Sequence, residues 1–218
     1  MTEYSLHSEI KDWYSKATNP VEVKVDDFII DVINEDGLLI EIQTRNLSSI
    51  KEKLRKLLKN NKVRLVYPIA KVKWIVYVSE IGEFVRRRKS PKKGKLTDLF
   101  VEMVNLPGLI THENFSFEVL FIEEEEQRCD DGKGSWRRKG ISIKDRKLIK
   151  IFNSVVFEDK TDFLKILPND MDERFTNKIL AKKMGISVRL AQKITYCLRK
   201  MNVISIAGKK KRELLFAT

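Results

Sequence analysis

The sequence predicts an α/β (α+β) fold, with a mixed sheet and flanking helices over residues 1–140 and a smaller basic domain over residues 141–218. Short β-branched runs alternate with amphipathic helical segments over the first 80 residues, which is typical of a mixed α/β layer. Near the C-terminus, two helical segments with N-capping residues precede two short apolar runs around a basic turn. Of the net charge of +12, +10 lies in residues 141–218, which favours contact with a polyanion.

Composition limits the class of protein. The chain has 218 residues and is 42% hydrophobic, which is enough for a globular core. No run approaches the roughly 18 apolar residues of a membrane helix, and the N-terminus has no signal pattern, so we expect a cytoplasmic protein with no membrane partner. Cys129 and Cys197 stand apart from one another, and we expect both to be reduced thiols rather than disulfide or zinc ligands.

Residues 28–44 (FIIDVINEDGLLIEIQT) predict a β-hairpin that carries two acids. A three-residue loop ending in a left-handed Gly37 would place Asp31 directly opposite Glu41. A two-residue loop would instead turn the two acids to opposite faces of the sheet. We favour the three-residue loop, because it gives Gly37 a conformation that only glycine adopts without strain and puts Gln43 on the same face as the acids.

Opposed carboxylates at Asp31 and Glu41 would have Cβ atoms about 5 Å apart. They would repel one another unless a cation lay between them. The hairpin therefore suggests a divalent-metal site.

The order of these acids resembles the PD-(D/E)xK nuclease superfamily. Its core is a helix with an acid, a strand with Asp, a turn, and a strand with Glu-x-Lys followed by a helix, and about the first 80 residues show this order. The matching residues are Glu9, Asp31, Glu41, Ile42 and Gln43, with Gln43 in place of the usual lysine. The resemblance implies phosphodiester hydrolysis with Mg²⁺ (or Mn²⁺) held by Asp31, Glu41 and the Ile42 carbonyl.

Three further side chains complete the implied site. Residues 6–17 predict an amphipathic helix whose apolar stripe is Leu6, Ile10, Trp13, Tyr14 and Ala17. Glu9 lies at the edge of this stripe, where it would reach the metal shell or lie on the surface. Gln43 can orient water but brings no charge. A capping box at residues 49–52 predicts a helix to about residue 60, and Lys53 on it is the candidate for a catalytic lysine moved from the strand. The alternative for Lys53 is an ordinary flanking lysine.

Between the hairpin and the C-terminal part, the pattern predicts more elements of the same layer. They are strands at 63–69, 72–79 and 115–122, a mobile basic loop at 86–95, a helix at 96–104 and a solvated acidic strand end at 123–126. The loop would hold a phosphate backbone without reading sequence. Stretches such as EIQT at 41–44, joined to a segment such as SWRRKG at 135–140, also resemble an uncharacterised bacterial and archaeal family, which implies a fold but no activity.

Residues 144–157 and 161–167 predict helices, the first with an apolar stripe of Leu148, Ile151, Phe152 and Val155. Residues 175–218 resemble a winged helix-turn-helix. Thr176 would cap a helix to about Met184, Gly185 would make the turn, and Ser187 would cap a longer helix to about Met201. A hairpin around residues 208–212 would form the wing.

The resemblance to a winged helix implies a DNA-binding surface. At the start of the second helix, Arg189 and Gln192 can contact guanine and adenine edges, and Val188, Lys193 and Tyr196 lie beside them. The wing cations would meet phosphates; they are Lys209, Lys210, Lys211 and Arg212. The alternative use of such a domain is protein contact or dimerisation.

Together these features predict a DNA-binding protein that resembles a metal-dependent endonuclease targeted by a winged helix. The alternative is a catalytically inactive DNA-binding transcriptional regulator whose α/β domain serves dimerisation, as a homodimer. A third hypothesis is a protein-interaction module that binds no nucleic acid.

Overall fold

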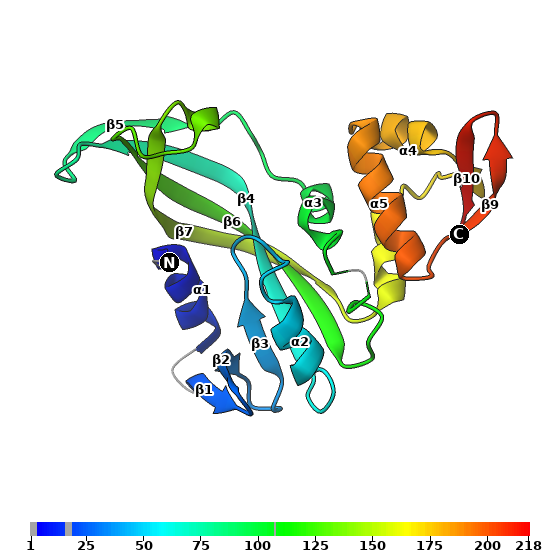
Figure 1. Cartoon of the computed structure of the whole chain (residues 1–218), viewed down its shortest axis with the longest axis horizontal. Helices are drawn as coiled ribbons and strands as arrows, with labels where there is room; N and C mark the ends of the chain where they lie inside the picture. Colours follow the sequence, from blue (N-terminus) through cyan, green and yellow to red (C-terminus); the bar gives the residue numbers. More distant parts are fainter. Residues whose placement is uncertain (1–3, 16–18, 107) are drawn as a thin grey trace.

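The computed structural model describes residues 4–15, 19–106 and 108–218. Within these residues, seven strands form one large mixed sheet with helices on both faces (Figure 1). The mixed α/β architecture is thus confirmed. The strands of the large sheet are β1 (Val21–Val25), β2 (Phe28–Ile33), β3 (Leu39–Ile42), β4 (Val63–Val78), β5 (Phe84–Lys89), β6 (Phe115–Asp130) and β7 (Ile141–Phe157).

Strand β4 is the centre of the sheet. The order is β1-β2-β3-β4-β6-β7, and β4 runs parallel to both β3 and β6. The predicted strands at 63–69 and 72–79 are one continuous strand, because a bulge between Ala70 and Val72 lets the chain continue across Lys71. β3 pairs with β4 only as far as Val66, and β5 pairs with the same strand from Trp74 onward.

The helix predicted at residues 144–157 is wrong, because this segment is strand β7. It pairs antiparallel with β6 along almost its whole length, from Ile141 to Phe157. Leu148 and Ile151, two residues of the expected helical stripe, pack against the core beneath helix α1 (Ser5–Ser15). The large sheet therefore continues to Phe157, beyond the expected boundary at residue 140.

The basic loop predicted at residues 86–95 is partly wrong as well. Residues up to Lys89 belong to β5, whose six residues are all exposed because it pairs only with β4. Strand β6 also extends beyond residue 122 through the acidic run.

Helices α1 and α2 (Lys51–Leu57) cover opposite faces of the sheet. α1 buries Leu6 and Ile10, whereas Trp13, expected on the same stripe, is 42% exposed. The predicted residue Ala17 lies outside the described residues. The capping box expected before α2 is wrong, because the N-cap is Ile50 and makes no side-chain cap. Ser49 instead donates to the Asn46 carbonyl.

The C-terminal part contains two α-helices and a small three-stranded sheet among the described residues. They are α4 (Asn177–Met184), α5 (Val188–Lys200), β8 (Arg174–Phe175), β9 (Ser205–Lys210) and β10 (Glu213–Ala217). The expected caps are confirmed: Thr176 accepts from the Ile179 amide, Ser187 from the Leu190 amide, and Gly185 is left-handed. The expected helix at 161–167 is the 3₁₀ helix η3 (Lys160–Ile166).

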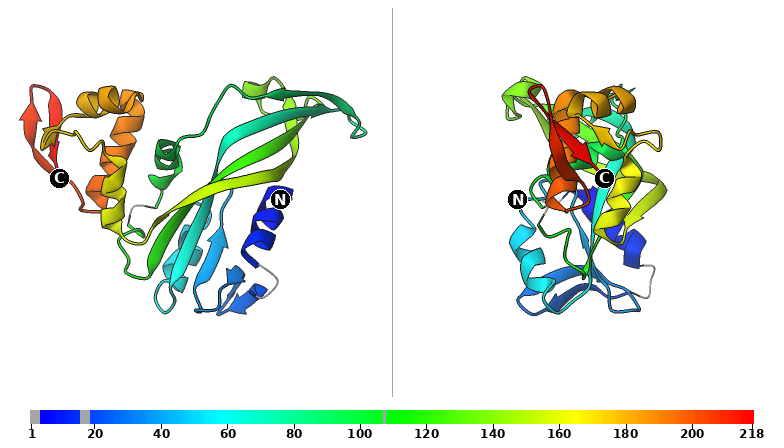
Figure 2. Two further views of the ribbon diagram at one scale, coloured as in Figure 1. Left: turned by 180° about the vertical axis from the view of Figure 1, so that it is seen from behind. Right: turned by 90° about the vertical axis from the view of Figure 1, so that its right-hand side faces the viewer.

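One continuous core joins the α2 face of the sheet to these C-terminal helices. Helix α3 (Phe100–Met103), which follows the 3₁₀ helix η1 (Leu96–Leu99), lies between the sheet and α5 (Figure 1). Phe163 of η3 stacks on Phe157 of β7 with ring centroids 4.2 Å apart. Figure 2 shows the C-terminal elements and α1 on opposite sides of the large sheet.

Candidate functional site

The β2–β3 hairpin has the register that the three-residue loop predicts. Val32 pairs with Ile40. The Asn34 amide donates to the Leu38 carbonyl, and Gly37 between them has a φ of +76°. Continued by one residue, this register would oppose Asp31 to Glu41.

The backbone ladder stops just before that pair. In a continued antiparallel ladder, the Ile42 amide would donate to the Ile30 carbonyl. It donates instead to the Asp31 carboxylate, at 2.8 Å from Oδ2. The strands therefore part at Asp31, and side chains take over the freed backbone groups.

Lys53 enters this opening from α2. Its Nζ donates to the Ile29 carbonyl at 2.5 Å and lies 2.6 Å from Oε1 and 2.7 Å from Oε2 of Glu41. The structure thus brings together three of the predicted site residues: Asp31, Glu41 and Lys53.

The surroundings of Glu41 disfavour its ionised form. The residue is only 2% exposed. Burial raises its pKa to about 7, the Asp31 charge acts in the same direction, and Lys53 opposes both. The hydrogen bond from Lys53 is directed at Oε2, and the same ammonium lies 2.6 Å from the buried Oε1.

Asp31 behaves in the opposite way. Burial alone raises its pKa, but the hydrogen bond and charge of His7 hold the pKa below its usual value, with help from the Ile42 amide and Lys53. His7 Nε2 lies 3.1 Å from Asp31 Oδ2. Sequence reasoning missed His7 because it chose Glu9, two residues along the same helix.

Two other predicted site residues, Glu9 and Gln43, make hydrogen bonds to groups outside this opening. Glu9 accepts from the Leu148 amide of β7 at 2.5 Å. The side-chain Nε2 of Gln43 donates to the Arg45 carbonyl at 2.5 Å and to Ser49 Oγ at 3.1 Å, so it supports the loop before α2.

The opening offers carboxylate oxygens, which are ligands that hard divalent cations prefer, but Lys53 contacts both oxygens of Glu41. Among the described residues, no group of three or more His, Cys, Asp or Glu side chains is arranged to hold a metal ion. A site here would therefore need the two carboxylates together with the Ile42 carbonyl. Oxygen donors of this kind suit Mg²⁺ and Mn²⁺, and an ion bound to Glu41 would share its carboxylate with Lys53.

A second charged cluster lies across strands β4, β6 and β7. It includes the acidic run at residues 123–126, which the sequence predicted to be a solvated strand end. That expectation is wrong, because Glu124 and Glu126 are only 4% and 1% exposed. Lys73 of β4 lies 2.6 Å from Glu124 and 3.2 Å from Glu126. Arg128 of the same strand and Arg146 of β7 pair with Glu126 at 2.6 and 3.1 Å, so β4, β6 and β7 together supply the compensating charge.

On α5, the buried positions leave one exposed stripe. It consists of Val188, Arg189, Gln192, Tyr196 and Lys200. Lys193 does not belong to this stripe, because its Nζ donates to the Val101 carbonyl of α3 at 3.1 Å. The four cations of the β9–β10 turn are all exposed; they are Lys209, Lys210, Lys211 and Arg212.

Comparison with known proteins places this site in a family. Residues 4–158 match the model of a domain of unknown function, DUF8091. The chain belongs to the DUF8091 family. An uncharacterised protein of Treponema pallidum (strain Nichols) is 33% identical over 215 residues, which is 98% of this chain and 84% of that protein. No solved structure matches significantly.

The DUF8091 match ends one residue after β7, at the end of the large sheet. Asp31, Glu41, Lys53 and the second charged cluster all lie within it, whereas α5 and the β9–β10 turn lie outside. The Treponema relative spans both parts. No helix in the described residues is long and apolar enough to cross a membrane.

Proposed function

We propose that this DUF8091 protein binds DNA and hydrolyses a phosphodiester bond with a divalent metal ion at Asp31 and Glu41. One observation carries the proposal. The parting of β2 and β3 gathers Asp31, Glu41 and Lys53 in the order that the PD-(D/E)xK resemblance implies, with the lysine supplied by the following helix.

Asp31, Glu41 and the Ile42 carbonyl would hold the Mg²⁺ or Mn²⁺. When bound, the ion would activate water and neutralise charge that develops on the phosphate. The Lys53 ammonium opposes the rise of the Glu41 pKa and would add a positive charge beside the substrate. Lys53 would thereby replace the lysine that the superfamily usually has at the position of Gln43. Gln43 itself supports the loop at residues 45–49.

Binding to DNA is supported by the C-terminal part, which we propose to be a winged helix. The exposed stripe of α5 retains Arg189 and Gln192, whose side chains can each bond a base edge in the major groove. The exposed turn between β9 and β10 would be the wing, and its cations would contact phosphates.

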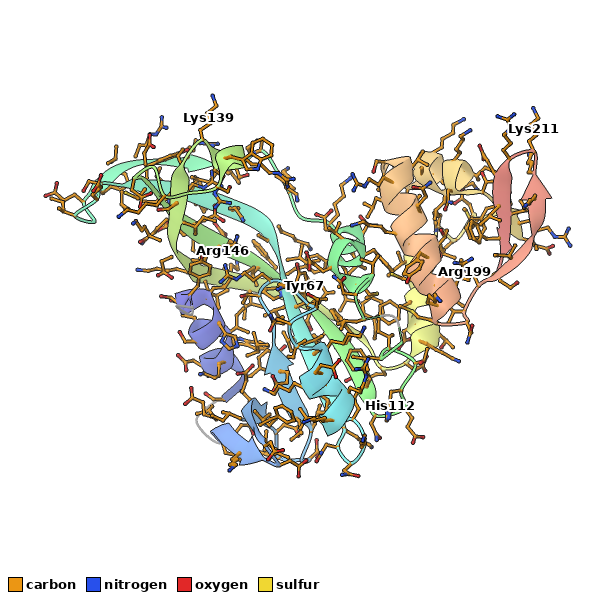
Figure 3. The ribbon with its side chains drawn as sticks, viewed as in Figure 1. Tyr67, His112, Lys139, Arg146, Arg199 and Lys211 are labelled. Carbon is orange, nitrogen blue, oxygen red and sulfur yellow. The ribbon has the colours of Figure 1, made fainter. Side chains whose placement is uncertain are left out.

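A second basic surface lies at the far end of the large sheet. It consists of residues 86–89 on β5 and residues 137–139, next to the 83% exposed Trp136 of the 3₁₀ helix η2 (Trp136–Arg138). Figure 3 shows Lys139 and Lys211 pointing the same way from opposite ends of the molecule. Both ends could therefore meet one nucleic acid.

A second candidate function is a DNA-binding regulator without catalysis, acting as a homodimer. It is favoured by the ion pair, because Lys53 already lies within 2.7 Å of both oxygens of Glu41 and could replace a metal.

Cleavage of plasmid and branched DNA distinguishes the two candidates. With Mg²⁺ or Mn²⁺, wild type should cut, and Asp31→Ala or Glu41→Ala should lower the rate by about 100-fold or more. Glu118→Gln is the matched control, because Glu118 is equally buried (5% exposed) but lies outside the site and should leave cleavage intact. Identical traces for wild type, Asp31→Ala and Glu41→Ala would exclude the enzyme.

DNA binding is measured separately, by fluorescence anisotropy over a range of salt concentrations. Arg189→Ala should weaken binding about tenfold, and replacing residues 209–212 by Gln should also reduce the salt dependence. Arg55→Ala is the control, because Arg55 is an exposed arginine on α2 at the other end of the chain. Binding that is independent of salt and of both changes would favour the protein-interaction hypothesis.

A further inference from the structure

A cavity of about 300 Å³ opens where β4 has no neighbouring strand on one side. β3 ends opposite Val66, and β5 ends opposite Trp74, so the intervening edge of β4 faces the loop at residues 90–95 instead. The Gly94 amide donates to the Ala70 carbonyl at 2.9 Å and holds the loop over this gap. The lining includes Thr44, Tyr67, Ser90, Lys92, Glu124 and Arg146.

The cavity carries an excess of positive charge. Lys73, Lys92, Arg128 and Arg146 line it, against the acids Asp98 and Glu124. Glu126, which lies behind the lining, adds a third acid and binds three of these cations. One positive charge therefore remains without a partner in the cluster, and exposed Lys92 lies on the covering loop.

The walls also offer hydrogen-bond donors. Arg146 pairs with Glu126 through Nη2, but its buried Nε has no hydrogen-bond partner in the described structure. The Arg146 side chain as a whole is 20% exposed and lines the cavity, so its guanidinium offers charged donors to a ligand there. Burial raises the pKa of Tyr67 to about 12, so its hydroxyl stays protonated. Figure 3 marks Tyr67 on β4 and Arg146 on β7.

We propose that this cavity binds a phosphate monoester. The volume lies at the small end of ligand pockets, which leaves room for a phosphoryl group and part of an attached sugar. Arg146 and Lys92 would bind the phosphoryl oxygens, with Thr44 and Ser90 hydroxyls as further donors. The source is either a free nucleotide or the 5′ end of a DNA strand. This goes beyond the proposed function, because the cavity does not include Asp31, Glu41 or Lys53.

The test uses the full chain in EDTA, so that no metal-dependent cleavage intervenes. Calorimetry measures binding of thymidine 5′-monophosphate and of thymidine, and competition compares one oligonucleotide with a 5′-phosphate or a 5′-hydroxyl. Lys92→Ala should weaken binding of the phosphorylated ligand about tenfold. Lys93→Ala is the matched control on the same loop and should leave it unchanged. Arg146→Lys keeps the charge but removes Nε, and should weaken binding with an unchanged circular dichroism spectrum.

Preference for thymidine monophosphate over thymidine supports the proposal with a free nucleotide as the source. A 5′-phosphate preference seen only with the oligonucleotide supports it with a DNA end. Absence of any phosphate preference, or equal weakening by Lys92→Ala and Lys93→Ala, overturns it. DNA that binds equally well with either 5′ end, together with equal binding of thymidine monophosphate and thymidine, overturns this inference alone and leaves the proposed function standing.

Discussion

Glu41→Gln should remove most of the dependence of stability on pH between about pH 5 and pH 8. In the folded protein, burial and the Asp31 charge raise the Glu41 pKa from 4.5 to about 7. The folded state therefore binds more protons than the unfolded state between these values. By linkage, the free energy of unfolding falls as pH rises through this window and is level above it.

The displacement of the pKa from 4.5 to about 7 corresponds to about 3 kcal/mol. The side chain is only 3% exposed, so solvent screening removes little of this value. A glutamine has no proton to lose, so the variant should keep near pH 8 the stability that it has near pH 5. Asp31→Asn is the contrasting variant, because the Asp31 pKa is lowered and its titration falls below this window.

Urea unfolding of wild type, Glu41→Gln and Asp31→Asn in EDTA, at several pH values, measures these differences. Wild type should lose about 3 kcal/mol from low to high pH, and Glu41→Gln should lose little. Asp31→Asn should lose an intermediate amount, because burial still raises the Glu41 pKa but the Asp31 charge no longer does. An equal slope for wild type and Glu41→Gln would show that Glu41 is not the titrating group and would refute this view of the site.

Three further changes test the packing of the fold. Phe163→Ala should lower the free energy of unfolding by about 3–5 kcal/mol in urea, because the ring is 1% exposed and stacks on Phe157. Gly94→Ala should cost about 1–3 kcal/mol, seen as a lower Tm, because a Cβ would lie 2.6 Å from the Ala70 carbonyl oxygen. Ser187→Ala should cost about 1 kcal/mol in urea and Ser187→Asn much less, because only alanine loses the helix cap.

Local chemistry made some parts of the structure predictable. Thr176, Gly185 and Ser187 delimit their helices with side chains and conformations that act within four residues. The same holds for Gly37, whose left-handed conformation sets the loop and thereby the register of the hairpin. The approach of Asp31 to Glu41 followed from that register.

Strand β7 was mistaken for a helix because its ladder with β6 is irregular. Register shifts near Phe152, Ile149 and Lys144 each insert an extra residue and break the period of two. Apolar residues such as Leu148 and Ile151 then recur at helical spacing. Only the partner strand, which begins 26 residues earlier, resolves the ambiguity.

The sequence also did not predict which side chains of different elements meet one another. The rotation of α1 determines that His7, and not Glu9, meets Asp31, and no local signal in the sequence sets that rotation. Burial of Glu126 likewise depends on Lys73 and Arg146 from neighbouring strands. The acidic run alone is typical of a solvated strand end.

The most direct test of the proposed site is metal binding at Asp31 and Glu41. Titration of the protein with Mn²⁺, followed by electron paramagnetic resonance, counts bound ions without requiring a substrate. Wild type and Glu118→Gln should bind an ion saturably above about pH 7, where Glu41 is ionised. Asp31→Ala and Glu41→Gln should lose this binding. No saturable binding in wild type, or equal binding in all four proteins, would contradict the proposal.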